Sequence, residues 1–164
     1  MTPFAHRLAM LHLAAADHPS FEISDIENRR LEKSYSIETL RIFRQEYGPA
    51  AQIYFIVGLD AMLEIDTWRE YQAIFTLCHF VVLDRPGSDP RQLQRLLCEK
   101  VQCVQLSSDL VFQHPGGNQV HFFPITRLDI SSTRIRGLAS QGRSLRFLLP
   151  EAVRRYILKN KLYT

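Results

Sequence analysis

The sequence predicts an α/β sandwich with a mainly parallel sheet, and three observations carry that prediction. The chain has 164 residues, 46% hydrophobic and 23% charged, as in an ordinary globular domain. Amphipathic segments alternate along it with short apolar runs. Two of these runs, 53–57 and 80–83, lack polar alternation, as expected of strands covered on both faces. No linker or repeat interrupts the pattern, so we expect one domain over residues 1–164.

The first third of the chain predicts a helix, a strand and a second helix. Apolar residues recur at helical spacing over 4–15, and residues 21–25 alternate between apolar and polar side chains as in a strand. Ser34 or Ser36 can cap the second helix, which is expected to end at Gly48.

The remaining elements continue the alternation of helices and strands. A helical stretch that carries Trp68 separates the two apolar strands, and Asp89 with Pro90 predicts the start of another helix. Further expected elements are a strand at 101–106, a hairpin around the turn at 115–118, a helix from 131 to 142 and a helix from 150 to 160.

The charge is distributed unevenly. Residues 127–164 hold nine Lys or Arg against two acids, whereas residues 1–126 hold eleven against fifteen. This basic helical part is expected to attract anions, as a solvated basic helix, a nucleic-acid surface or a polyphosphate site. The three cysteines form no CxxC pair, which favours a reducing cytoplasm. No apolar run approaches the roughly 18 residues of a membrane span, so no membrane partner is expected.

Candidate binding residues follow the first predicted parallel strand. Ligands of such sheets bind beyond the carboxyl ends of the strands. Gly58 allows close backbone approach and Asp60 can accept from a sugar hydroxyl, unless they are a turn glycine and a helix cap. Trp68 can stack on a flat ring or belong to the core.

A second group of candidates lies at the start of the predicted helix near residue 131. Ser131, Ser132 and Thr133 offer donors at a helix N-terminus, and Arg136 adds a cation one turn on. Together they suit a phosphate, although a simple helix cap explains the hydroxyls as well. Arg85, after the second apolar strand, is a further candidate for a phosphate.

Several enzyme classes lack support. The sequence contains no G-x-x-x-x-G-K-[ST] loop, no G-x-G-x-x-G turn and no G-x-S-x-G elbow. These motifs mark P-loop nucleotide hydrolases, dinucleotide dehydrogenases and serine hydrolases. His6, His12 and His18 recur every six residues and are scattered around a helix, which argues against a metal site.

Taken in order, these segments closely resemble the bacterial nicotinate-nucleotide adenylyltransferases, a family of the nucleotidylyltransferase superfamily with a Rossmann-like three-layer fold. The resemblance covers almost the whole chain. It is carried by HRLAM at 6–10, DIE at 25–27, SYSIETL at 34–40, FIVGLD at 55–60, Trp68, VVL and RPG at 81–87, ISSTRIR at 130–136 and LLPEAV at 148–153.

The resemblance implies transfer of AMP from ATP to nicotinate mononucleotide, giving nicotinate adenine dinucleotide and pyrophosphate. By the family pattern, Trp68 stacks on the pyridine ring, and Thr39 with the backbone N–H of Arg69 holds its carboxylate. Gly58 and Asp60 contact the ribose of this nucleotide.

The same pattern assigns the phosphates. Arg85 contacts the phosphate of the mononucleotide, and Ser131, Ser132 and Arg136 contact those of ATP. Mg²⁺ enters with ATP, and no residue of this chain is predicted to bind it.

One part of the family pattern is not found. Family members carry a first strand and a G-G-[ST]-F-[DN]-P-x-H-x-G-H segment whose two histidines bind the triphosphate, and the sequence lacks this segment. We therefore expect a sheet without its first strand and helix, an exposed apolar slot, and low activity of the chain itself. The family usually has Thr at the position of Ser36, which keeps the hydroxyl.

Two other functions stay open at this point. An adenylyltransferase of the phosphopantetheine type shares the superfamily pattern, but Trp68, Thr39 and the Gly58-x-Asp60 spacing argue against it. A non-catalytic nucleotide- or RNA-binding module would use the basic part at 127–164, where aromatic residues are sparse. Nucleic acid is thus not the expected partner, and a homo-oligomer is compatible with the sequence.

Overall fold

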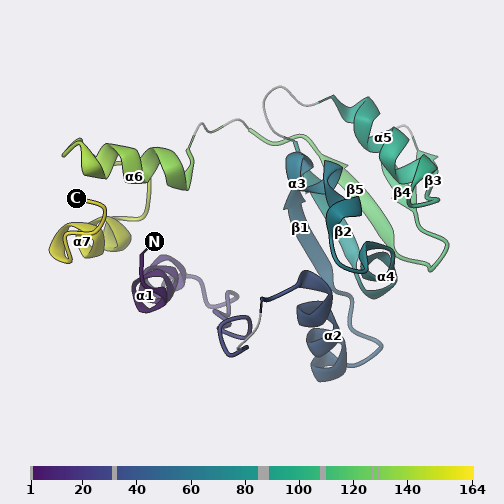
Figure 1. Cartoon of the computed structure of the whole chain (residues 1–164), viewed down its shortest axis with the longest axis horizontal. Helices are drawn as coiled ribbons and strands as arrows, with labels where there is room; N and C mark the ends of the chain where they lie inside the picture. Colours follow the sequence, from purple (N-terminus) through teal and green to yellow (C-terminus); the bar gives the residue numbers. More distant parts are fainter. Residues whose placement is uncertain (1, 31–32, 85–88, 108–109, 127, 129) are drawn as a thin grey trace. The chain divides into compact units, whose positions relative to one another are not determined.

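A computed structural model describes residues 2–30, 33–84, 89–107, 110–126, 128 and 130–164 (Figure 1). Its contacts divide the chain into two compact units. The sheet unit comprises Arg30–Arg127, and the helical unit joins Met1–Arg29 to Leu128–Thr164. Each unit is described by itself. The single domain over residues 1–164 stays a prediction.

The sheet unit has five strands among its described residues, in the order β1-β2-β5-β4-β3. They are β1 (Tyr54–Gly58), β2 (His79–Leu83), β3 (Val104–Ser107), β4 (Val111–Gln113) and β5 (Gln119–Phe123). β1, β2 and β5 run parallel, with Ile56 opposite Val81 and Val81 opposite His121. β4 pairs antiparallel with both β5 and β3. This arrangement confirms the predicted α/β class, and the β4–β5 hairpin encloses the predicted turn.

Five helices belong to this unit among the described residues. They are α2 (Ser36–Tyr47), α3 (Leu59–Leu63), the 3-10 helix η1 (Ile65–Thr67), α4 (Tyr71–Leu77) and α5 (Pro90–Glu99). The predicted cap of α2 is wrong: Tyr35 occupies the N-cap position of that helix without a side-chain cap, and Ser36 is its first residue. α2 ends at Gly48, whose φ of +79° suits a residue without a Cβ. α5 begins as predicted, because the Asp89 side chain accepts from the Arg91 N–H at 3.0 Å.

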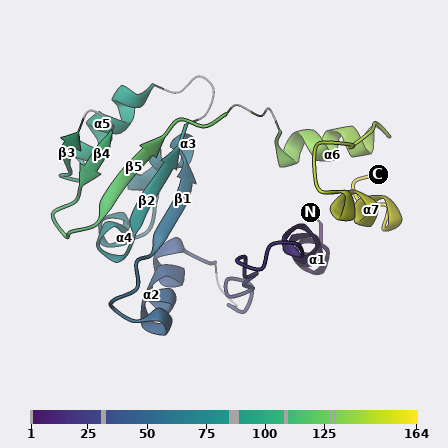
Figure 2. The same cartoon turned by 180° about the vertical axis from the view of Figure 1, so that it is seen from behind.

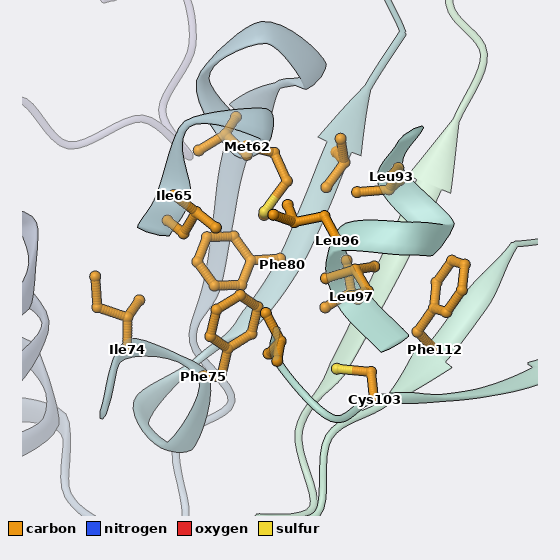
Figure 3. Packing of buried hydrophobic residues seen from close by; sticks show 14 of the residues in the cluster. Met62, Ile65, Ile74, Phe75, Phe80, Leu93, Leu96, Leu97, Cys103 and Phe112 are labelled. Atoms are coloured by element: carbon orange, nitrogen blue, oxygen red, sulfur yellow. The ribbon is translucent and has the colours of Figure 1, made fainter. Parts of the chain in front are cut away.

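The core lies between these helices and one face of the sheet. Alternate residues of the central strands point into it, and Phe80, Val82 and Val120 are at most 1% exposed, as the period of two in a strand requires. Figure 3 shows Phe80 beside Phe75 of α4, with ring centroids 4.8 Å apart. The strands, α3, α4 and α5 therefore form two packed layers.

The opposite face of the sheet is apolar and exposed. α3, α4 and α5 lie on the same side of the sheet (Figures 1 and 2). On the other side Tyr54, Ile56 and Phe123 are 50%, 63% and 50% exposed. The expectation that run 53–57 is covered on both faces is therefore wrong for this unit, because the described helices of the unit pack on one face. The third layer of the sandwich stays a prediction.

The strand expected at 21–25 is absent. A strand needs a neighbour for its backbone groups, and no strand of the described sheet pairs with this segment. The Phe21 N–H donates instead to the His18 carbonyl at 3.0 Å, and the Asn28 N–H to the Asp25 carbonyl at 2.8 Å. Alternation of side chains was thus insufficient to form a strand.

The helical unit consists of α1 (Phe4–Ala15), α6 (Ser132–Ser140) and α7 (Glu151–Lys159). Its small core contains Ala139, Leu145, Val153 and Ile157. α1 and α7 are also joined by a 2.9 Å hydrogen bond between His6 Nδ1 and the Tyr156 hydroxyl. Among the described residues, no helix has the length and apolar character needed to span a bilayer.

Two isoleucine truncations test this two-layer packing. Ile65 is fully buried, whereas Ile56 is 63% exposed on the open face. We expect Ile65→Ala to lower the free energy of unfolding by about 2–5 kcal/mol, and Ile56→Ala by less than about 1 kcal/mol. Urea unfolding followed by circular dichroism measures both. Equal losses would mean that the second face is covered in solution.

Candidate functional site

A cavity of about 200 Å³ lies beside Trp68 in the sheet unit. Its walls come from the start of α2 and from the chain that links η1 to α4 (Figure 1). The lining residues are Lys33, Ser34, Tyr35, Ser36, Thr67, Trp68, Arg69 and Ile74. We call this the Trp68 cavity. Its volume is below the roughly 300–1,000 Å³ of drug-sized pockets, so it suits one ring with its substituents.

Trp68 is anchored by the core. Its ring is partly buried against Phe55 of β1, with centroids 6.0 Å apart, and its backbone N–H donates to the Ile65 carbonyl at 2.9 Å. Ile74, fully buried in α4, forms another wall. An indole fixed in this way loses little freedom when a flat ring stacks on it.

The chemistry of the walls favours an anion. Lys33 and Arg69 supply positive charge, Ser36 and Thr67 supply hydroxyls, and the described residues that line the cavity include no acid. The Thr67 hydroxyl already donates its proton to the Glu64 carbonyl at 2.7 Å, so Ser36 is the better hydroxyl donor for an anion. The cavity thus combines an aromatic wall with cations and hydroxyls.

A network of ion pairs fixes Arg69 at the rim. Arg69 Nη1 lies 3.2 Å from Glu38 Oε1, and its guanidinium carbon lies 4.8 Å from the Tyr35 ring centroid. Glu70 Oε1 lies 3.9 Å from Arg69 Nε, and Glu70 Oε2 lies 2.5 Å from Arg41 Nη2. The hydrogen bond from Arg41 lowers the pKa of the Glu70 carboxyl, so Glu70 remains ionised at neutral pH.

The structure brings only some of the predicted residues to this cavity. Trp68 and Arg69 line it, but Thr39 lies further along α2 and is not among the lining residues. Ser36, at the first position of α2, lines it instead. The family usually has Thr at this position. That shared hydroxyl was the sequence signal that could have identified Ser36 as a residue of the cavity.

The other residues predicted for the mononucleotide lie elsewhere. Gly58 ends β1, and Asp60 is an exposed residue of α3. Neither is among the residues that line the Trp68 cavity. Arg85 falls outside the described residues.

The residues predicted for ATP lie in the helical unit. Ser131 caps α6, because its hydroxyl accepts from the Arg134 N–H at 3.2 Å. Arg136 Nη2 donates to the Thr133 hydroxyl at 3.2 Å. Ser132 and Arg136 also line a second, mainly apolar cavity of about 420 Å³ formed by α1, α6 and α7. The predicted helix cap and its cation therefore come together at one helix end.

Comparison with known proteins places the chain in a family. Residues 1–138 match the cytidylyltransferase-like family model. The probable nicotinate-nucleotide adenylyltransferase of Syntrophotalea carbinolica is 43% identical over 164 residues. That alignment covers 98% of this chain and 74% of the relative. The chain belongs to the nicotinate-nucleotide adenylyltransferase family.

Solved structures support the fold of this adenylyltransferase family member. It is similar to Plasmodium falciparum nicotinic acid mononucleotide adenylyltransferase complexed with APC, with a TM-score of 0.70 and 18% identity. The complex of that protein with NaAD gives a TM-score of 0.67 and 20% identity. Both alignments cover 99% of this chain, and 77% and 75% of the solved chains. They confirm the predicted nucleotidyltransferase-type α/β fold.

The positive character of the Trp68 cavity can be measured through its indole. Trp68 is the sole tryptophan of the sequence, so emission excited at wavelengths that tyrosine does not absorb reports this cavity alone. We expect iodide to quench it more strongly than caesium at low ionic strength, with the difference shrinking as salt screens Lys33 and Arg69. Stern–Volmer plots give the quenching constant of each ion. Stronger quenching by caesium would show that acids dominate the cavity.

Proposed function

We propose that this chain carries the nucleotide sites of an enzyme that transfers AMP from ATP to nicotinate mononucleotide, a step of NAD biosynthesis. The Trp68 cavity carries the proposal, because its described walls join an aromatic ring to hydroxyls and cations and contain no acid. Such walls suit a planar ring that bears a carboxylate. The 43% identity to a nicotinate-nucleotide adenylyltransferase supports the same substrate.

The pyridine ring would stack on Trp68, and its carboxylate would accept from the backbone N–H of Arg69 and from a hydroxyl. Thr39 is the hydroxyl that the family pattern assigns. Ser36 is the stronger candidate on geometry, because it lines the cavity. Gly58 and Asp60 would contact the ribose at the end of β1, and Arg85 would contact the mononucleotide phosphate.

The phosphates of ATP would bind at the start of α6. Ser131 and Ser132 lie where the helix presents free N–H groups, and the helix dipole there favours negative charge. Arg136 adds a guanidinium, which can hold phosphate oxygens with two parallel hydrogen bonds. This group would bind the triphosphate and neutralise the charge that develops on it.

Mg²⁺ would reach the reaction on the triphosphate. Among the residues that the structure describes, no three His, Cys, Asp or Glu side chains gather as a metal site. The cation would be held mainly by substrate phosphates and water, as Mg²⁺ commonly is. When bound, Mg²⁺ neutralises phosphate charge and favours departure of pyrophosphate.

For this reaction the protein mainly has to align the two substrates and neutralise charge, and no side chain forms a covalent bond with them. A phosphate oxygen of nicotinate mononucleotide attacks the α-phosphorus of ATP, and the bond from that phosphorus to the bridging oxygen of the β-phosphate breaks. The electron pair leaves with pyrophosphate. Trp68 and Ser36 would hold the attacking nucleotide, and Arg136 would stabilise charge on the departing phosphates.

Calorimetric binding of both substrates to the 164-residue chain tests this assignment. We expect Trp68→Ala to weaken binding of nicotinate mononucleotide about 5- to 150-fold, since stacking of a ring contributes about 1–3 kcal/mol. Binding of Mg²⁺–ATP should change little. Arg136→Ala should weaken binding of Mg²⁺–ATP and leave binding of the mononucleotide unchanged.

Phosphopantetheine serves as the competing ligand in these titrations. Tighter binding of phosphopantetheine than of nicotinate mononucleotide would overturn the proposed substrate. Equal effects of the two substitutions on both ligands would refute the division of the site. Release of pyrophosphate from ATP, with and without the mononucleotide, measures the activity itself.

A pair of hydroxyl deletions on α2 separates the two candidates for the carboxylate. Ser36→Ala is expected to lower the affinity for nicotinate mononucleotide about tenfold or more, the effect of a hydrogen bond to a charged group. Thr39→Val removes a hydroxyl from the same helix outside the cavity lining and should have the smaller effect. Titration calorimetry compares them. A larger loss in Thr39→Val would restore the family-based assignment.

A further inference from the structure

We infer that the side chain of Arg69 makes the Trp68 cavity select a ring carrying a carboxylate over the same ring carrying a neutral amide. This inference rests on the proposed function and adds to it a specificity-determining side chain, where the family pattern uses only the backbone N–H of this residue. Three observations support it: the position of Arg69, the contacts that hold its guanidinium, and the charge balance around the rim.

The position of Arg69 places its charge at the ring-binding wall. It directly follows Trp68 and lines the same cavity, together with Tyr35. Its side chain is 51% exposed, so an incoming ligand can reach it. A substituent on a ring stacked against Trp68 therefore meets a cation supplied by the neighbouring residue.

The guanidinium is held in place before any ligand arrives. Glu38 pairs with Nη1 at 3.2 Å, and the guanidinium carbon lies 4.8 Å from the centroid of the Tyr35 ring. A guanidinium has five N–H donors, so one that donates to Glu38 can still donate to a second carboxylate. Preorganisation of this kind lowers the entropic cost of binding.

Lys33, the other cation of the lining, is held more loosely. Its described contact is with the Tyr35 ring, whose centroid lies 5.6 Å from Nζ. An ammonium on a flexible four-carbon chain also lacks the planar fork that matches a carboxylate. Arg69 is therefore the better candidate for discrimination between acid and amide.

The charges around the rim leave a positive surplus. The described network contains Arg30, Lys33, Arg41 and Arg69 against Glu38 and Glu70. In addition, Arg30 Nη2 is buried without a hydrogen-bond partner among the described residues. Within the part of the chain that the structure describes, these four cations outnumber the two acids and favour a ligand with one more negative charge, which the acid has and the amide lacks.

Trp68 emission provides the measurement, because Trp68 is the sole tryptophan. The 164-residue chain is titrated with nicotinate mononucleotide and with nicotinamide mononucleotide, which have nearly the same shape and differ in this charge. We expect the acid to bind more tightly. Arg69→Gln should weaken binding of the acid about tenfold and change the affinity for the amide by less than about twofold, so that the selectivity is lost.

Three further variants separate this role from a structural one. Arg69→Lys keeps the charge and should recover part of the selectivity. Lys33→Gln removes the second cation of the lining and should cost less selectivity than Arg69→Gln. Arg95→Gln removes an exposed arginine on α5, outside the lining, and should leave both affinities unchanged. Circular dichroism confirms that each variant is folded.

The outcomes separate the two proposals. A wild-type chain that binds neither mononucleotide would overturn the proposed function and this inference with it. A wild-type chain that prefers the acid, with the same preference in Arg69→Gln, would leave the proposed function standing and overturn the role of Arg69. A loss that is equal for acid and amide in Arg69→Gln would also refute it.

Discussion

The Trp68 cavity depends on the burial of one face of the sheet. Phe80 of β2 packs against Phe75 of α4 and also against Phe55 of β1, with ring centroids 5.6 Å apart in the second pair. Phe55 in turn supports Trp68. The polar walls of the cavity are therefore attached to a close-packed interior, in which side chains have little room to move. A binding site on such a support can hold a ring in one orientation.

The electrostatics of the cavity come from a different source. Tyr35, Glu38 and Arg41 are three residues apart at the start of α2, so helical geometry puts them on neighbouring positions of one side. Arg69 and Glu70 approach them from the chain before α4. Individual exposed ion pairs add little to stability. Here they hold the Arg69 guanidinium next to the Trp68 cavity.

The open face of the sheet and the helical unit bury less apolar surface than the core of the sheet unit does. Ile56 and Phe123 belong to strands that pair well within the sheet, yet their side chains remain exposed on the open face. Backbone pairing fixes these strands independently of whether the second face is covered. The helical unit has a smaller core, formed by four buried residues and the apolar side chains packed on them. The hydrogen bond between His6 and Tyr156 joins two of its helices, α1 and α7.

The sequence by itself determined the elements whose signals are local. Apolar runs located β1 and β2, the turn at 115–118 located the β4–β5 hairpin, and Asp89 with Pro90 located the start of α5, because caps, turns and periodicity act over a few residues. The hydroxyls at the start of α6 were also predicted from the sequence, Trp68 was predicted as a residue that stacks on a ring, and the family resemblance gave the activity. Tertiary structure alone decided which hydroxyl of α2 reaches the cavity, that residues 21–25 form no strand, and which acids hold Arg69. These outcomes depend on contacts between residues far apart in the chain, such as Arg69 with Glu38, and no local pattern encodes them.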